Sequence, residues 1–276
     1  MSEMSNLWKR IFVGVAAIPL ILLAAAKGGV LFLLFVAVVI GIGALELFSL
    51  ERAKGARPNR TLGVLGAWGL SWAFCFGGGH SVMLVLIGTV VLVLAAELAR
   101  KDAGSPIANV SGTLLGVLYL GLSGGALLLI REGTGTFSYG EAGRLVMLLF
   151  GMLWAMDTAA YFVGRRFGRH KLFPRVSPKK SVEGAIGGLI GSLAVAFVAA
   201  CTVTPFLPMG HHLALGAIVG VAGQVGDLAE SQLKRDAGVK DSSTLLPGHG
   251  GILDRFDSLF FAGPLACGYL ILAGLL

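Results

Sequence analysis

The segment from Ser231 to Asp257 places acidic and basic side chains together, next to the last apolar stretch of the chain. It reads SQLKRDAGVKDSSTLLPGHGGILDRFD, in a chain that is only 13% charged and 55% hydrophobic. Carboxylates can hold a divalent cation, and ammonium or guanidinium groups can bind phosphate oxygens. The combination predicts phosphate chemistry at a membrane surface.

Three aspartates are the predicted metal ligands. Asp227 ends one apolar run, and Asp254 and Asp257 lie three residues apart, on one face of a helix that opens the last run. Mg²⁺ prefers a few carboxylates together with water, and it bridges from them to substrate phosphates. The alternative is that acids at a helix start only stabilise the helix dipole.

Further polar residues share a helix face with Asp227. Glu230, Ser231 and Lys234 follow it at i+3, i+4 and i+7, which is the spacing of one face. Because an apolar run leads into this face, we expect it to start at the bilayer boundary and to emerge into the cytoplasm. A merely solvated helix end is the alternative.

Several bases are expected on the same side of the membrane, enough for a substrate with more than one phosphate. They are Lys179, Lys180, Lys234, Arg235, Lys240 and Arg255. In the segment SPKKSVEG, we expect Ser177 to cap a helix with Pro178 in its first position, so that the helix end and both lysines form an anion site. Glu183 lies four residues after Lys179 and would pair with it on that helix. An ordinary positively charged loop is the alternative.

Two more features complete the polar set. Gly250 and Gly251 follow Lys240 and Asp241, and glycines let the backbone approach a ligand and point N–H groups at phosphate oxygens. Asp157 lies midway along an apolar run, where an ionised acid costs about 2.5–3.5 kcal/mol and needs a partner or a wet cavity. A protonated or paired structural acid is the alternative for Asp157.

Together these groups predict metal-dependent phosphoryl or nucleotidyl transfer on a membrane-embedded anionic substrate. A metal between phosphates neutralises charge and aligns the attacking and leaving groups. The sequence contains no G-x-x-x-x-G-K-[ST] phosphate-binding loop and no G-x-S-x-G motif, so a P-loop nucleotide site and acyl transfer are not expected.

The elements that must position these residues are membrane helices. The mean hydropathy is +0.83, and about nine apolar runs are long enough, or nearly so, to cross a bilayer, which takes about 20 residues. We therefore predict an all-α, polytopic integral membrane protein. The runs lie near 11–26, 29–50, 62–76, 81–99, 111–130, 145–164, 184–204, 212–229 and 258–275. The many glycines suit close helix packing in lipid.

Nine spans with a cytoplasmic N-terminus place nineteen of the 22 lysines and arginines in cytoplasmic loops. Only Lys27, Arg131 and Arg144 fall outside. The net charge of +7 is then a property of the cytoplasmic face, which favours anionic lipid and phosphate over nucleic acid. A cleaved signal peptide is the alternative for the first run.

The chain divides by chemistry into two parts. Residues 1–140 are expected to form a transmembrane scaffold for lipid or subunit contacts, and residues 141–276 a catalytic half with its site at the cytoplasmic face. Cys75, Cys201 and Cys267 lie in apolar runs without a C-x-x-C pair, which predicts no disulfide framework and no zinc site.

The segment from Ser231 to Asp257 closely resembles the signature of the phosphatidate cytidylyltransferase (CDP-diacylglycerol synthase) family. The upstream segments W-x2-D-T-x-A-Y-F-x-G-R-x-F-G and S-P-K-K-S-x-E-G resemble it too. The detailed resemblance covers about residues 145–265, and the first half matches only by hydropathy. Ser181 stands where we expect Thr, and Ala159 where Gly is common.

The resemblance implies that CTP and phosphatidate give CDP-diacylglycerol and pyrophosphate. It implies Mg²⁺ at Asp227, Asp254 and Asp257, and in this family the metal centre can include a second, monovalent ion such as K⁺. The remaining roles also follow from it. Lys234, Arg235 and Lys240 would hold the triphosphate, Lys179 and Lys180 would meet phosphate, His249 would bind a phosphate oxygen or orient a metal ligand, and Asp157 and Asp241 would orient bases. A homodimer and a bacterial inner membrane are further expectations from the family.

Three other functions compete with this one. A transporter for a phosphorylated solute also uses intramembrane acids, but no inverted repeat is visible and the polar residues gather at one side. Another membrane enzyme of lipid phosphate metabolism, such as a lipid kinase or a CDP-alcohol phosphotransferase, is the second. The D-G-x2-A-R pattern of the latter is absent. An inactive lipid-binding paralogue is the third, and the intact acids and bases argue against it.

Overall fold

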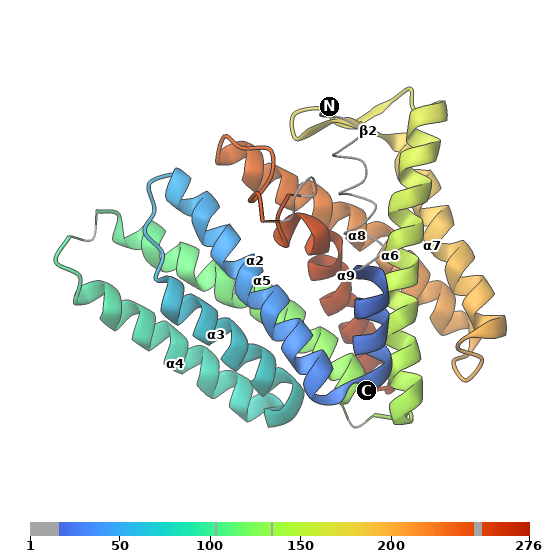
Figure 1. Ribbon diagram of the computed structural model, residues 1–276, viewed down its shortest axis with the longest axis horizontal. Coiled ribbons are helices and arrows are strands. Elements are labelled where there is room, and N and C mark those ends of the chain that lie inside the picture. The colour runs from blue at the N-terminus through green and yellow to red at the C-terminus, as the bar shows by residue number, and fades with distance from the viewer. Residues whose placement is uncertain (1–16, 103, 134, 246–249) are drawn as a thin grey trace. The chain divides into compact units, whose positions relative to one another are not determined.

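The computed structural model describes residues 17–102, 104–133, 135–245 and 250–276, and these are mostly helical (Figure 1). After an apolar helix over Ala17–Lys27, the elements are α2 (Gly29–Ala53), α3 (Arg60–Trp72), η1 (Ala73–Gly77), α4 (Gly78–Leu98), α5 (Pro106–Glu132), α6 (Tyr139–Phe167), β1 (Lys171–Phe173), β2 (Ser177–Ser181), α7 (Val182–Thr202), α8 (Met209–Asp236) and α9 (Leu253–Leu272). Seven helical stretches of the described residues are long and apolar enough to cross a membrane. The expected all-α polytopic membrane fold is therefore confirmed.

The number of spans depends on how one stretch is counted. Arg60–Leu98 counts as a single stretch of 39 residues, yet α3 and α4 within it lie side by side, joined by the π-helical turn η1 (Figure 1). The chain turns back at Gly78, whose φ of 67° favours glycine. The predicted runs 62–76 and 81–99 thus correspond to two packed helices. Since residues 1–16 lie outside the described part, nine spans and a cytoplasmic N-terminus stay predictions.

The chain forms two compact units that do not correspond to its two halves. One contains residues Met1–Leu129 and Leu233–Phe256, and the other contains Ile130–Gln232 and Asp257–Leu276. The end of α8 and the start of α9 therefore pack with the N-terminal helices. The chemical division near residue 140, into a scaffold half and a catalytic half, stays a prediction.

In the first unit, the ring of Phe48 on α2 is wedged between two helices. Phe48 is fully buried, and a Cβ atom added at Gly63 of α3 or at Gly116 of α5 would overlap its ring. Small residues at such points let membrane helices approach closely. This wedge sets the position of α2, which carries the buried Glu46 half a turn earlier.

In the second unit, α7 packs on α6 through glycines. Cβ atoms added at Gly184 and Gly191 would each lie 2.9 Å from a carbonyl oxygen of α6, those of Ala160 and Ala155 respectively. On another side of α7, the side chain of Gln224 donates a hydrogen bond of 3.0 Å from α8 to the carbonyl of Ala185. The glycine-rich composition thus serves helix contact, as expected from the sequence.

The expected helix start at Ser177 is wrong. Residues Ser177–Ser181 form strand β2, which pairs antiparallel with β1, and α7 begins at Val182. The capping residue is Ser181, whose hydroxyl accepts a hydrogen bond of 3.1 Å from the N–H of Gly184. The sequence offers two serines with the same capping chemistry, and pairing with β1 selects the later one.

The expected helical pair between Lys179 and Glu183 is also wrong, because Lys179 belongs to the strand. The Glu183 carboxylate instead accepts hydrogen bonds from the backbone N–H of Arg169, at 3.0 Å, and of His170, at 3.2 Å. His170 Nδ1 lies 2.6 Å from the same carboxylate. Glu183 thereby ties the end of α6 to the start of α7.

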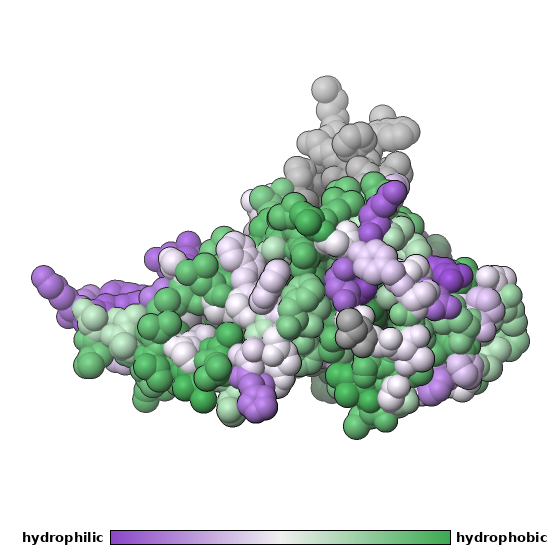
Figure 2. Space-filling view, turned by 90° about the horizontal axis from the view of Figure 1, so that it is seen from below, coloured by the Kyte–Doolittle hydropathy of each residue, from purple (hydrophilic) through white to green (hydrophobic). Residues whose placement is uncertain are grey.

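Large apolar side chains cover much of the surface (Figure 2). Helix α4 is an example, since Leu84, Ile87 and Leu92 are all more than half exposed. Such a surface is unfavourable in water and suits contact with lipid tails. It agrees with the apolar length of the helices.

Replacing Gly116 tests the wedge around Phe48. We expect Gly116→Ala to lower the free energy of unfolding by about 1–3 kcal/mol, because the methyl group would overlap a fully buried ring. Thermal unfolding of the purified protein in detergent measures the change. Gly88→Ala in α4 is the matched control, since its Cβ would meet no atom within 4 Å. Equal stability of the two variants would contradict the wedge.

Candidate active site

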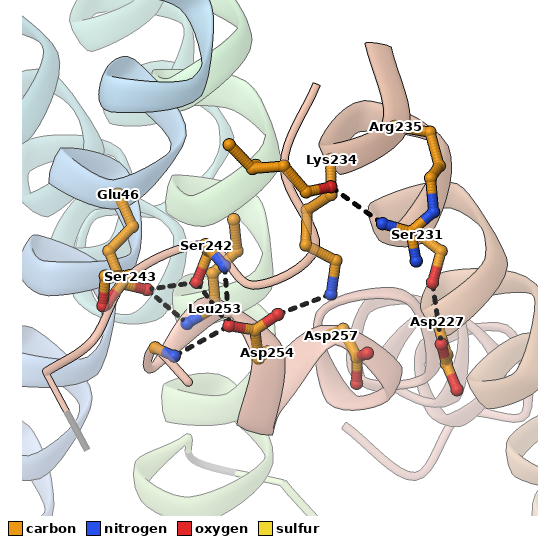
Figure 3. A network of polar contacts seen from close by, with 12 residues as sticks. Glu46, Asp227, Ser231, Lys234, Arg235, Ser242, Ser243, Leu253, Asp254 and Asp257 are labelled. Carbon is orange, nitrogen blue, oxygen red and sulfur yellow. Dashed lines mark hydrogen bonds and ion pairs between the residues drawn. The ribbon is translucent and has the colours of Figure 1, made fainter. Parts of the chain in front are cut away.

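In the first unit, the carboxylate of Asp254 is held by four donors (Figure 3). Its Oδ1 accepts a hydrogen bond of 2.5 Å from the ammonium of Lys234, which lies in the last turn of α8. Its Oδ2 accepts from the N–H and the hydroxyl of Ser242, at 2.8 and 2.7 Å, and from the N–H of Gly251, at 2.7 Å. Asp254 is only 9% exposed, so these donors replace the water that its charge would otherwise bind.

A second carboxylate, Glu46 of α2, binds the same loop and is 6% exposed. Its Oε1 accepts from the hydroxyl of Ser243 at 2.6 Å and from the N–H of Ile252 at 3.1 Å. Its Oε2 accepts from the N–H of Leu253 at 2.7 Å and lies 3.1 Å from the hydroxyl oxygen of Ser242, whose single proton has the shorter contact to Asp254. Glu46 therefore contacts both the beginning and the end of the segment between α8 and α9.

The sequence analysis did not identify Glu46. The signal was present, because Glu46 is an acid inside an apolar run, the same feature that drew attention to Asp157. Its partners lie about 200 positions later in the chain, and no spacing rule connects residues so far apart.

Gly250 and Gly251 have a structural reason to be glycine. Gly250 has a φ of 79°, which side-chain-bearing residues rarely adopt. A Cβ atom at Gly251 would overlap the Ser242 hydroxyl and both oxygens of Glu46. The backbone at these glycines does approach acidic oxygens closely, as predicted, but the oxygens belong to protein carboxylates. The N–H of Gly251 donates to Asp254.

The other predicted residues of this unit lie at the surface. The guanidinium of Arg235 donates to the carbonyl of Val239 at 2.8 Å, and its side chain is exposed. Lys240, Asp241 and Arg255 are exposed as well. They flank the buried Lys234–Asp254 pair in sequence and can reach a charged ligand from solvent. His249 lies outside the described residues.

In the second unit, Asp227 of α8 meets a lysine of strand β2. Lys180 Nζ lies 2.6 Å from Oδ2 of Asp227, and the hydroxyl of Ser231 donates to Oδ1 at 3.3 Å. The strand thus brings one base of the predicted anion site to an acid of the predicted metal site. Lys179 is exposed and Ser177 is half-buried in the same strand.

Helices α8 and α9 approach closely beside Asp227. A Cβ atom at Gly226 would lie 2.7 Å from the carbonyl oxygen of Asp257. Oδ1 of Asp257 accepts from the N–H of Ser258 at 2.6 Å, and the carboxyl groups of Asp227 and Asp257 point to the same side in Figure 3. Gly226 thus lets the part of α8 that carries Asp227 approach the backbone of Asp257.

The predicted polar face of α8 is helical and is not a solvated helix end. Glu230 is fully buried, and Ser231 and Lys234 are less than 10% exposed. Asp157, in the middle of α6, is exposed at the surface of the protein. Its predicted partner or wet cavity stays a prediction.

The donors suit a hard cation, since Mg²⁺ prefers carboxylate oxygens. Asp227 and Asp254 each have a lysine ammonium at 2.5–2.6 Å, which shows that each is placed to accept a positive charge. Within the described part of the chain, no group of three or more His, Cys, Asp or Glu side chains is arranged to hold a metal ion.

Comparison with known proteins agrees with this chemistry. The profile of the cytidylyltransferase family matches residues 8–273, nearly the whole chain. The chain belongs to this family. A cytidylyltransferase from Synechocystis is 35% identical over 299 residues, covering 96% of each chain, and one from Bacillus subtilis is 32% identical over 276 residues, covering 98% of this chain and 99% of the relative. Both relatives are named phosphatidate cytidylyltransferase.

One relative matches a shorter part of the chain at a higher sequence identity. A phosphatidate cytidylyltransferase from Staphylococcus haemolyticus is 51% identical over 120 residues, covering 44% of this chain and 46% of the relative. Part of the chain is therefore much more similar to its relatives than the full-length identities of 32–35% suggest. The family resemblance inferred from the sequence is confirmed.

Replacing Gly251 tests the arrangement around the two buried acids. We expect Gly251→Ala to destabilise the protein by about 1–3 kcal/mol, because the methyl group would displace Ser242 or Glu46. Thermal unfolding in detergent measures the loss. Gly268→Ala in α9 is the control, because its Cβ would meet nothing within 4 Å. If Gly251→Ala were as stable as this control, the loop would be able to accommodate a methyl group, and the close contact of Gly251 with Ser242 and Glu46 would be contradicted.

Proposed function

We propose that this protein transfers the cytidylyl group of CTP to phosphatidate, giving CDP-diacylglycerol and pyrophosphate. The observation that carries the proposal is the match of residues 8–273 to the cytidylyltransferase family. Relatives that span nearly the same length are named for this reaction. The apolar helices provide the membrane setting that a lipid substrate requires.

The reaction needs little more than placement and charge neutralisation. An oxygen of the lipid phosphate attacks the α-phosphorus of CTP, a new P–O bond forms, and the bond to the β-phosphate oxygen breaks. Because a phosphate monoester is mostly ionised at neutral pH, no general base is required. The developing charge on pyrophosphate must be stabilised by positive groups.

From the family resemblance, we assign Asp227, Asp254 and Asp257 as carboxylate ligands of Mg²⁺. When bound, the metal would neutralise phosphate charge and align the attacking and leaving oxygens. A metal would have to replace the lysine ammonium that now pairs with Asp227 and with Asp254. A second, monovalent ion such as K⁺ is expected only from the family resemblance.

Basic side chains complete the proposed site. Lys234, Arg235 and Lys240 would bind the triphosphate and the departing pyrophosphate. Lys179, Lys180 and Arg255 would bind the lipid phosphate or CTP. The remaining polar residues would orient these groups. They are Asp157, Ser177, Glu183, Ser231, Asp241 and His249, together with the backbone of Gly250 and Gly251.

The protein is an integral membrane protein, and relatives of bacterial origin favour a plasma membrane. We place the site at the cytoplasmic face, where CTP is available and where the predicted topology puts most lysines and arginines. A homodimer is expected only from the family.

An assay on the purified protein in detergent tests the function. Pyrophosphate should be released from CTP only when phosphatidate and Mg²⁺ are both present. Asp254→Asn should lower turnover by at least about 1,000-fold, because it removes a charge that positions Lys234 and is proposed to bind metal. Asp236→Asn is the control, an exposed acid paired with Lys54. Turnover of ATP but not CTP would indicate a kinase, and solute flux without nucleotide cleavage a transporter.

Metal removal is a separate test. We expect excess EDTA to abolish pyrophosphate release and added Mg²⁺ to restore it, because phosphate charges would otherwise repel one another. Protein from which metal has been removed should still unfold cooperatively, which separates lost chemistry from lost structure. Full activity in EDTA would rule out the divalent-metal assignment.

A further inference from the structure

Glu46 belongs to the N-terminal helices but holds the segment that leads into α9. Its contacts join Ser242 and Ser243, just after α8, to Ile252 and Leu253, at the start of α9. Asp254 likewise accepts from Ser242 and from Gly251. Glu46 is 6% exposed, so its charge is matched by these donors and hardly by water.

The two carboxylates also occupy the N-terminal end of α9. The first N–H groups of a helix have no partner within it, and they attract anions such as phosphate. Here the N–H groups of Ile252 and Leu253 point at Glu46, and that of Gly251 points at Asp254. Protein acids therefore fill the place that a phosphate could take, and phosphate binding is left to basic side chains.

A chain of contacts leads from Glu46 to the lysine of the site. The hydroxyl of Ser242 lies 3.1 Å from Glu46 and 2.7 Å from Asp254. Asp254 in turn accepts from Lys234 Nζ at 2.5 Å. Because one hydroxyl contacts both acids, a shift of Glu46 must shift the donors that hold Asp254, and with them Lys234.

We propose that Glu46 is a positioning residue for the transfer reaction. It fixes residues 242–243 and 252–253, which flank the loop before α9, so that Asp254 and Lys234 stand in their working geometry. It acts through Ser242 and the backbone of Ile252 and Leu253. This inference rests on the proposed cytidylyl transfer, and it gives the N-terminal half of the chain a part in the site.

Replacing Glu46 by Gln removes this function with almost no change in size. The amide replaces one acceptor oxygen by an NH₂ donor. This donor would face the N–H and hydroxyl groups that now donate hydrogen bonds to Glu46. We expect Glu46→Gln to lower kcat about 10- to 100-fold, because small misplacements of reacting groups cost rates of this order. The KM for CTP should change by a smaller factor than kcat, because Lys234 is only one of the three proposed triphosphate-binding residues, and the other two, Arg235 and Lys240, are exposed. Glu46→Asp keeps two acceptors and should recover part of the rate.

The matched control is Glu97→Gln. Glu97 is 9% exposed in the same unit, accepts from Asn109 at 2.6 Å and pairs with Arg100, away from the segment between α8 and α9. It loses a buried charge in the same way, so it reports the general cost of this substitution. We expect its kcat to stay within about twofold of the parent.

A double-mutant cycle tests the route through Ser242. If Glu46 acts through this hydroxyl, the kcat of Glu46→Gln combined with Ser242→Ala should be close to that of the worse single variant. Hydrogen exchange at the amides of residues 251–253 should also become faster in Glu46→Gln and stay unchanged in Glu97→Gln. This second readout reports the local contacts directly and does not depend on turnover.

Each outcome decides one question. If the parent protein converts no CTP with phosphatidate, the proposed function fails, whereas the exchange data still test the position of Glu46. If the parent is active, a Glu46→Gln protein with parental kcat overturns the positioning role. So does an equal loss in Glu97→Gln, which would indicate general destabilisation. Multiplied losses in the double variant would overturn the route through Ser242, because they would show that Glu46 and Ser242 act independently.

Discussion

A carboxylate buried in a largely apolar protein must be matched by donors or cations, and much of this protein's polar structure follows from that constraint. Removing an ion from water costs several kcal/mol unless protein groups replace the lost hydrogen bonds. Asp254 and Glu46 each have three donors of their own, and the Ser242 hydroxyl, which has one proton, lies between them. Asp227 has a lysine and a serine. Lys234, Ser242, Ser243 and Gly251 of the signature segment thus contribute donors to these acids.

The same constraint explains why the N-terminal helices matter to the site. A segment rich in glycine and serine has little apolar surface with which to fix itself. Glu46 supplies fixed acceptors for it, and the wedge of Phe48 between Gly63 and Gly116 holds the helix that carries Glu46. The apolar packing of Phe48 therefore supports the hydrogen bonds of Glu46, half a turn away on α2. The distinction between a passive scaffold and a working half is less sharp than the sequence indicates.

Local patterns predicted the elements well where one signal dominates, and less well where two signals compete. Apolar length identified the helices, because each must cover the same bilayer thickness. The division into the runs 62–76 and 81–99 and the polar face of α8 also followed from the sequence. The segment around Ser177 did not, since Ser177 and Ser181 both suit a helix cap and only pairing with β1 selects between them. Glu183 was given the wrong partner for the same reason.

By itself, the sequence determined the membrane class, the helix-forming segments and the family, and it supplied the charged residues that we propose for the site. These depend on composition and on spacings of a few residues, which act within one helix or one motif. Only the tertiary structure decided that Glu46 holds the segment before α9, that Lys180 meets Asp227, and that Gly251 must leave room for two oxygens of Glu46. Such contacts depend on how helices pack against one another, and no regular spacing along the chain encodes that arrangement.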